Sequence, residues 1–186
     1  LQSRQGYFTN EYDNASFDRQ RSLLSNAYLK YKPGNNWSLS VNVKQNSLSN
    51  YGPFPLIPVQ QSVRDVLDQG YKLNQNDNGE MRDRTSNASL VVQHDGATVT
   101  FTSQTAYQSN YRYYRDPLDG DFSPLKIVSI SNDYGKEWNR VKVWTQEFRF
   151  GSPASMKGPW NWTAGAYLFD QHNPVKQATN FGDDAS

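Results

Sequence analysis

Cysteine is absent from the 186 residues, and so is any continuous apolar run of about 20 residues. The first absence excludes a disulfide scaffold, thiol catalysis and cysteine zinc sites. The second excludes a transmembrane helix. The net charge is only +1, so the chain lacks the basic surface that nucleic-acid binding requires. An initiator methionine and the basic and apolar regions of a signal peptide are missing too, and we therefore expect a mature product or an excerpt.

Apolar residues are also scarce, whereas aromatic residues are plentiful. The hydrophobic fraction is 35%, below the level that is usual for soluble globular domains. Aromatic residues nevertheless make up 14% of the chain, with 5 Trp, 12 Tyr and 9 Phe. This composition argues against a disordered chain and favours a fold that places aromatic side chains beside polar ones.

Strict alternation of apolar and polar residues is the dominant pattern. From Trp37 to Val43 every odd position is apolar, and every even position is Ser or Asn. A similar stripe runs through Leu23, Ala27, Leu29 and Tyr31, and the two stripes are separated by the turn formers Pro-Gly-Asn-Asn. A period of two indicates β-strands, so the sequence predicts a hairpin over residues 21–48.

Further strands follow the same pattern. Alternation over 87–93 and 98–108 flanks Asp95-Gly96, which predicts a two-residue turn. A third pair is expected at 142–150 and 160–170, and one more strand at about 4–12. The sequence thus predicts about seven strands, the long ones of roughly 10–12 residues, which suits strands tilted across a bilayer.

The connections and the aromatic residues support a membrane barrel. Turns at 33–36, 94–97 and 151–159 are short, whereas the connections at 49–80, 111–141 and from 172 onward are long, as in transmembrane barrels. Residues 63–70 are expected to form a short helix within the first long connection. Aromatic girdles are expected at both strand ends, namely Trp37, Trp160 and Trp162 by the short turns and Tyr51, Tyr111, Tyr113 and Tyr114 opposite. A soluble β-sandwich is the alternative, because its strands alternate as well.

Three stretches of this sequence then resemble a known family. Thr-Gln-Glu-Phe-Arg-Phe-Gly-Ser-Pro over 145–153, followed by Trp-Asn-Trp-Thr-Ala-Gly-Ala-Tyr-Leu-Phe-Asp over 160–170, resembles the mid-barrel hairpin of TonB-dependent outer-membrane receptors. Ser-Arg-Gln-Gly-Tyr-Phe-Thr-Asn over 3–10 resembles an early-barrel segment of that family, and 21–37 resembles the hairpin after it.

The resemblance implies an all-β fold, an antiparallel transmembrane β-barrel segment within a larger barrel of 22 strands. Residues 1–186 would be a partial barrel domain, without the plug domain and the rest of the barrel. The implied location is the outer membrane of a Gram-negative bacterium. The implied function is capture of a scarce solute, most often a ferric siderophore, at the extracellular mouth for import energised by TonB. The implied partners are outer-membrane lipid, the ligand, and the TonB complex acting through the plug.

The candidate ligand-binding residues are aromatic and cationic side chains near the long connections. The densest run is Tyr-Arg-Tyr-Tyr-Arg over 111–115, in which Arg would pair with an anionic ligand and Tyr would stack on it. An aromatic belt is the alternative interpretation of this run. The complete set of candidates is Tyr51, Tyr71, Arg112, Tyr113, Arg115, Trp138 and Arg140.

Other chemistry finds little support. No hydrolase, zinc-protease or nucleotide-binding motif occurs, and His94 and His172 lie at strand ends, so we expect neither an enzyme nor a cofactor or metal site. Three carboxylates over 116–121 form an oxygen-rich loop that would suit Ca²⁺, although their spacing does not match an EF-hand. A passive porin and a soluble carbohydrate-binding sandwich remain as alternative functions.

Overall fold

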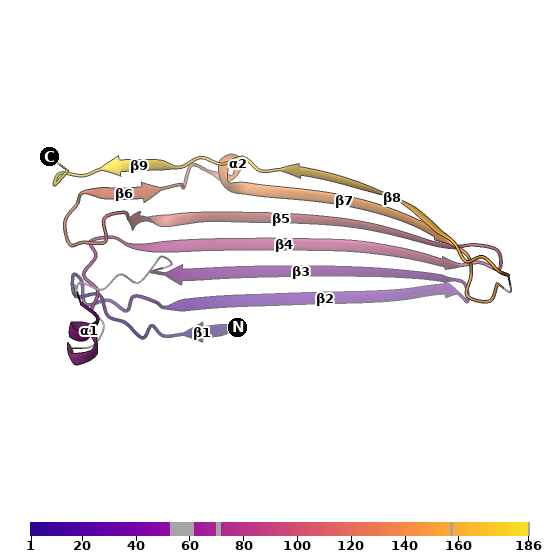
Figure 1. Ribbon diagram of the computed structural model, residues 1–186, viewed down its shortest axis with the longest axis horizontal. Coiled ribbons are helices and arrows are strands. Elements are labelled where there is room, and N and C mark those ends of the chain that lie inside the picture. Colours follow the sequence, from indigo (N-terminus) through magenta and orange to yellow (C-terminus); the bar gives the residue numbers. More distant parts are fainter. Residues whose placement is uncertain (53–61, 70–71, 157, 186) are drawn as a thin grey trace.

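The computed structural model describes residues 1–52, 62–69, 72–156 and 158–185, and these form one antiparallel sheet. Figure 1 shows its long strands running side by side in a single layer. The strands are β1 (Gln2–Arg4), β2 (Gln20–Gly34), β3 (Trp37–Tyr51), β4 (Asn78–Asp95), β5 (Thr100–Asp119), β6 (Val128–Ser131), β7 (Arg140–Gly151), β8 (Thr163–His172) and β9 (Ala178–Phe181). Two short helices accompany them, α1 (Val63–Gln69) and α2 (Lys136–Asn139).

Neighbours in the sheet are mostly neighbours in the sequence. The order runs from β1 through β2, β3 and β4 to β5. One half of β5 then pairs with β7, which pairs with β8, while its last residues pair with β6, which pairs with β9. Within the described residues β8 pairs only with β7, and β1 covers only three residues of β2, so the sheet does not close on itself.

The register divides the side chains between two faces, because alternate residues of a strand point to opposite sides. One face, called the apolar face below, has Val41 opposite Leu90 and Tyr107 opposite Trp144. Its other central members are Ala27, Leu29, Tyr31, Leu39, Val43, Ala88, Val92, Phe101, Phe148, Phe150 and Leu168. The opposite face, called the polar face, carries Asn26, Lys30, Ser40, Asn42, Lys44, Asn87, Ser89, Gln104, Gln108, Thr145 and Glu147.

One amide interrupts the apolar face without being left unpaired. The Gln146 side chain is buried, accepts a hydrogen bond from the Thr105 hydroxyl at 2.5 Å and donates one to the Ser103 hydroxyl at 2.9 Å. Because these partners lie on the next strand of the same face, the polar atoms satisfy one another.

The hydrophobic core is small and lies at one end of the sheet, where the long connections gather. Phe17, Leu73, Tyr111 and Leu118 are the buried apolar residues among those described. The Asn10 side chain, fully buried, donates to the Gln75 carbonyl and accepts from its backbone N–H at 2.7 and 2.9 Å, which ties the N-terminal segment to the start of β4. The apolar face itself has no covering layer in the described part of the chain, and its side chains are exposed.

Several sequence expectations are confirmed. The three hairpins form, with turns near 35 and between β4 and β5, and the central residues alternate between the faces as predicted. The short helix expected over 63–70 is α1. The all-β class is confirmed. Neither described helix has the length and apolarity that a membrane-crossing helix requires.

Other expectations are wrong. The sheet has nine strands rather than about seven, because β6 and β9 form within segments expected to be loops. The strand expected at about 4–12 ends at Arg4, because the Asp18 carboxylate accepts the Tyr7 and Phe8 backbone N–H groups that a strand neighbour would otherwise take. The turn expected at Asp95-Gly96 spans residues 96–99, since Asp95 still pairs with Thr100.

The predicted strand lengths were also too short. β4 and β5 contain 18 and 20 residues, so their pairing continues through 111–119, which was expected to be a connection. Acidic and basic residues face each other across this extension, and such cross-strand pairs stabilise a sheet. The connector after β7 is longer than predicted, because β8 begins at Thr163 and leaves Trp160 and Trp162 outside the strand.

Candidate functional site

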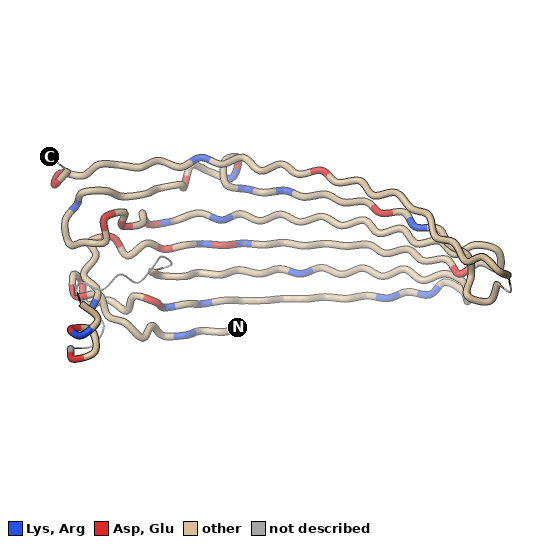
Figure 2. The backbone as a smooth tube through the Cα atoms, viewed as in Figure 1, with Lys and Arg blue, Asp and Glu red and all other residues tan. Residues whose placement is uncertain are grey.

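Charged residues gather at the end of the sheet that carries the long connections, as Figure 2 shows. All described candidate residues lie toward this end. Tyr51 closes β3, Arg112, Tyr113 and Arg115 lie on the outer half of β5, Trp138 belongs to α2 and Arg140 opens β7. Tyr71 lies outside the described residues.

The polar face holds one ion-pair cluster, centred on Asp83 of β4. Its carboxylate is buried and lies directly opposite Arg112, which donates from Nε at 2.8 Å. Asn110 and Thr85 donate to its other oxygen at 2.7 and 2.9 Å. Arg112 keeps 59% of its side chain exposed, so its guanidinium reaches both the buried carboxylate and the surrounding solvent.

A second cluster is built on Glu80, near the first residues of β4. Its carboxylate is 3% exposed and forms ion pairs with Arg82 and, at 3.3 Å, with Arg115. The Arg115 side chain remains 58% exposed. β4 and β5 shift register between Glu80 and Met81, which leaves Arg115 as an extra residue on β5. The two arginines predicted to bind an anion therefore both already carry a carboxylate partner.

Tyr111 and Tyr113 lie on the apolar face, whereas Tyr114 pairs with Met81 on the same face as Arg112. Tyr111 and Tyr113 stack with ring centroids 4.7 Å apart. Arg140 pairs with Tyr111 across β5 and β7, and its guanidinium lies 5.8 Å from the ring centroid. This arrangement agrees with the aromatic-belt interpretation of the tyrosines, and it separates Tyr113 and Arg140 from the arginine on the polar face.

The remaining two aromatic candidates each contact a cation. The Tyr51 ring carries the Arg19 guanidinium 4.0 Å from its centroid. Trp138 lies 5.3 Å from the Lys176 ammonium, which is also 4.5 Å from the Tyr134 ring. Both contacts are cation–π interactions, in which the ring face attracts positive charge. The structure therefore distributes the candidates over several clusters instead of gathering them into one pocket.

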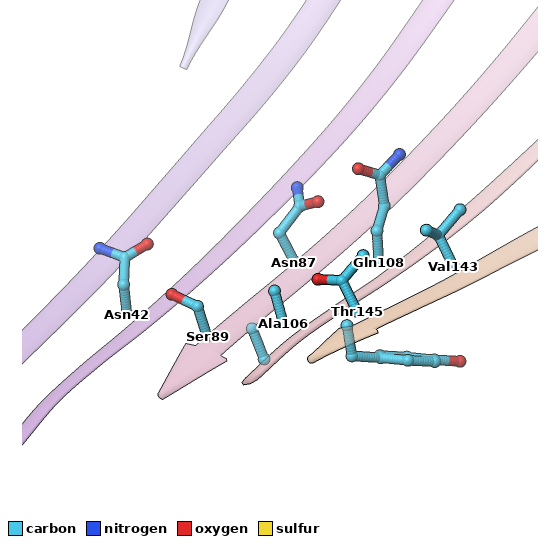
Figure 3. Close-up of a pocket in the computed structure, with 9 residues that line it drawn as sticks. Asn42, Asn87, Ser89, Ala106, Gln108, Val143 and Thr145 are labelled. Atoms are coloured by element: carbon cyan, nitrogen blue, oxygen red, sulfur yellow. The ribbon is translucent and has the colours of Figure 1, made fainter. Parts of the chain in front are cut away.

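An open groove of about 190 Å³ lies further along the sheet. Figure 3 shows the labelled side chains standing on one side of the sheet, and the register assigns that side to the polar face. They are Asn42, Asn87, Ser89, Ala106, Gln108, Val143 and Thr145. Uncharged amides and hydroxyls line it together with apolar side chains and without a charged residue, so the groove can offer hydrogen bonds to a polar solute. Sequence reasoning missed it, because its members come from four strands, β3, β4, β5 and β7, whose register only the fold sets.

The acidic loop after β5 is tightly hydrogen-bonded. Asp119 is buried and accepts the backbone N–H groups of Asp121 and Phe122 at 3.0 and 2.7 Å. Burial raises the pKa of the Asp119 carboxyl to about 6, against the effect of these two hydrogen bonds, and the nearby Asp121 and Asp77 raise it further. Burial likewise raises the pKa of Asp77, while Lys126 lowers it.

Within the residues that the structure describes, no three His, Asp or Glu side chains are arranged to hold a metal ion. His94 stacks on Trp37 with centroids 4.4 Å apart, so this histidine is packed at the strand end where the sequence placed it.

Two residues essential to this geometry were not predicted, namely Asp83 and Glu80. Their sequence signal was present, because 80–84 reads Glu-Met-Arg-Asp-Arg, and this charged run lies opposite the charged run of β5. Comparisons with protein-family models, with curated proteins and with solved structures find no match to this chain. We therefore infer the function of this chain from the different chemistry of the two faces of the sheet and from the sequence resemblance.

Proposed function

We propose that this chain is part of the wall of an outer-membrane β-barrel that binds a scarce solute at its extracellular mouth for TonB-energised import. The observation that carries the proposal is the exposed apolar face of a single-layer sheet whose other face is mostly polar over the central strands. A sheet in water buries its apolar face against a second layer. In a membrane barrel lipid covers that face instead, and the polar face lines the lumen.

The degree of exposure supports lipid rather than water as the solvent of the apolar face. Leu29 is 67% exposed, Leu168 53% and Val43 48%, and all three lie in the middle of long strands. Each buried apolar side chain contributes about 1.5–3 kcal/mol, so a folded chain that left so many in water would forgo most of its driving force.

The length of the strands also supports a membrane barrel. A barrel strand needs about 9–11 residues to cross the hydrocarbon. β2 and β3 have 15 residues each, and β4 and β5 have more, which is enough to cross and to project beyond one surface. The charged clusters on Asp83 and Glu80 lie on that projection, where water is available to them.

The open edges support a larger barrel. Unpaired backbone groups in lipid cost several kcal/mol each, so membrane barrels close. Most of β2 and all of β8 have an unpaired edge in the described sheet, and we propose that further strands pair there. The 22-strand plugged barrel implied by the resemblance would supply these strands.

The import function follows from the resemblance of 145–170 to TonB-dependent receptors, and the ferric siderophore is proposed on the same basis. We place the ligand mouth at the projecting end, where Arg112 and Arg115 are partly exposed. An anionic ligand would share their guanidinium groups with Asp83 and Glu80. Tyr51 and Trp138 would form part of the surrounding wall.

Cysteine-accessibility mapping tests the barrel, because the chain has no native cysteine to interfere. We expect spin labels attached to Val41→Cys and Leu90→Cys, with the protein in its native membrane, to collide with oxygen dissolved in the lipid. Labels at the adjacent Asn42→Cys and Ser89→Cys should collide with a water-soluble nickel chelate instead. A sandwich would shield the first pair from both reagents, and that outcome would reject the membrane wall.

Uptake measurements test the energised transport. Cells that carry the protein should accumulate ferric siderophore under iron limitation, and a protonophore should abolish the accumulation. Uptake that persists at the same rate with the protonophore would instead identify a passive porin.

A further inference from the structure

The apolar face carries a cluster of cations that lacks the acidic partners found in the two ion-pair clusters. Arg84, Arg140 and Lys142 lie on this face, with Tyr111 between the two arginines. Arg84 pairs with Tyr111 on one side, and Arg140 pairs with it on the other. Neighbouring strands are about 4.8 Å apart, so the two arginines stand about 10 Å from each other, within joint reach of one small anion.

The balance of charge around these three residues is positive. Arg84 and Lys142 are exposed, and neither has an ion pair within the described part of the chain. Asp133 accepts a hydrogen bond from Tyr111 at 3.4 Å, and Asp170 lies diagonal to Lys142. None of the three cations forms an ion pair with either carboxylate.

The arginines of this cluster differ from those of the two ion-pair clusters. Arg112, Arg115 and Arg82 each pair with a buried carboxylate. Arg84 and Arg140 form no ion pair among the described residues, and the Nε of Arg140 is buried there without a hydrogen-bond acceptor, as is the Nε of Arg82. An unused donor beside unpaired cations indicates that the cluster is completed by an anion from outside the sheet.

The position of the cluster indicates which anion. Tyr107 and Trp144 form an exposed aromatic row of the apolar face, at 42% and 38% exposure. Lys142 follows one row further along β7, and Arg140 follows one row after that. A lipid whose acyl chains covered Tyr107 and Trp144 would therefore place its headgroup at the three cations. Long cationic side chains favour this placement, because they can reach toward the membrane interface.

We propose that Arg84, Arg140 and Lys142 bind the phosphate of a membrane-lipid headgroup on the outer surface of the sheet. This inference rests on the proposed function, which places the apolar face against lipid. Phosphate suits the site, since guanidinium groups bind its oxygens through paired N–H donors and Lys adds a point charge.

Brominated lipids provide the test, because they quench tryptophan and Trp144 lies beside the site. The full protein is reconstituted in vesicles of phosphatidylcholine with a minor fraction of brominated phosphatidic acid, or of brominated phosphatidylcholine. We expect brominated phosphatidic acid to quench the tryptophan fluorescence of wild type more strongly than the same fraction of brominated phosphatidylcholine, which would show a preference for phosphatidic acid. Arg84→Gln combined with Lys142→Gln should weaken this preference on the order of tenfold, since each cation near an anionic surface contributes about 1 kcal/mol.

The matched control removes two cations from the polar face, as Lys30→Gln combined with Lys44→Gln. Its lipid preference should equal that of wild type. Equal effects of the two double variants, or no preference in wild type, would overturn the headgroup site while leaving the membrane wall intact. Absence of quenching by brominated phosphatidylcholine would show that the apolar face does not meet lipid, and it would reject the proposed function and this site together.

Discussion

Asp83 is the residue that stabilises the projecting end of β4 and β5. Its buried carboxylate receives hydrogen bonds from Arg112, Asn110 and Thr85. We expect Asp83→Asn to lower the free energy of unfolding by about 1–3 kcal/mol, because the substitution removes a charge-assisted bond inside a buried network. Chemical denaturation in detergent measures the loss. Asp95→Asn, at an exposed strand end, is the control, and an equal loss in both variants would contradict the role given to Asp83.

Asp119, the last residue of β5, makes the stability of the loop that follows depend on pH. Its pKa rises from 3.8 to about 6 on folding, because the carboxyl is buried. The folded chain therefore binds the proton more tightly than the unfolded chain. The resulting stabilisation is complete below pH 3.8 and is lost as the pH rises through about 6.

Asp119→Asn should remove this dependence, because the amide oxygen can still accept both backbone N–H groups and has no proton to lose. The melting temperature of wild type should fall between pH 4 and pH 7 relative to that of the variant. Thermal melts over this range measure the difference, with the exposed Asp183→Asn as control. Parallel curves for wild type and Asp119→Asn would refute the prediction.

At the scale of the element, β4 shows how one strand serves two environments. Leu90 faces the apolar side and the adjacent Ser89 the polar side. We expect Leu90→Arg to reduce assembly in the membrane, since a charge on the lipid face of a barrel costs about 2–4 kcal/mol at mid-depth. Ser89→Arg should assemble normally.

The amount of protein in the outer-membrane fraction, and its resistance to heat in detergent, measure this assembly. The two substitutions add the same side chain one residue apart, so any general effect of arginine on synthesis cancels. Equal assembly of both variants would mean that the two faces of β4 do not differ in environment.

At the scale of the whole molecule, the described part of the sheet lacks a core along most of its length. The buried apolar residues cluster at one end, and the apolar face is open. We expect this 186-residue chain to aggregate in water and to become monodisperse in detergent, which would cover the apolar face. Sedimentation with and without detergent measures both states. A monodisperse 21.3 kDa monomer in water would contradict the membrane assignment and favour the sugar-binding sandwich.

The alternation of apolar and polar residues predicted most of the long strands. Alternation has a period of two, which depends only on neighbouring residues, so the strands around Val41, Leu90 and Phe148 and their faces could be identified from the sequence. The turn near Asn35 was identified for the same reason. The strand expected over 4–12 failed because a distant carboxylate, that of Asp18, took the N–H groups that a strand would have used.

The candidate site was predicted only in part. The sequence placed the cationic and aromatic candidates near the long connections, and the described candidates lie toward the end of the sheet that carries these connections, most of them on strands. Which face each one occupies depends on register, and register is set by pairing between residues far apart in the chain. The tertiary structure alone therefore decided that Arg112 meets Asp83 on the polar face, while Tyr111, Arg84 and Arg140 meet on the apolar face.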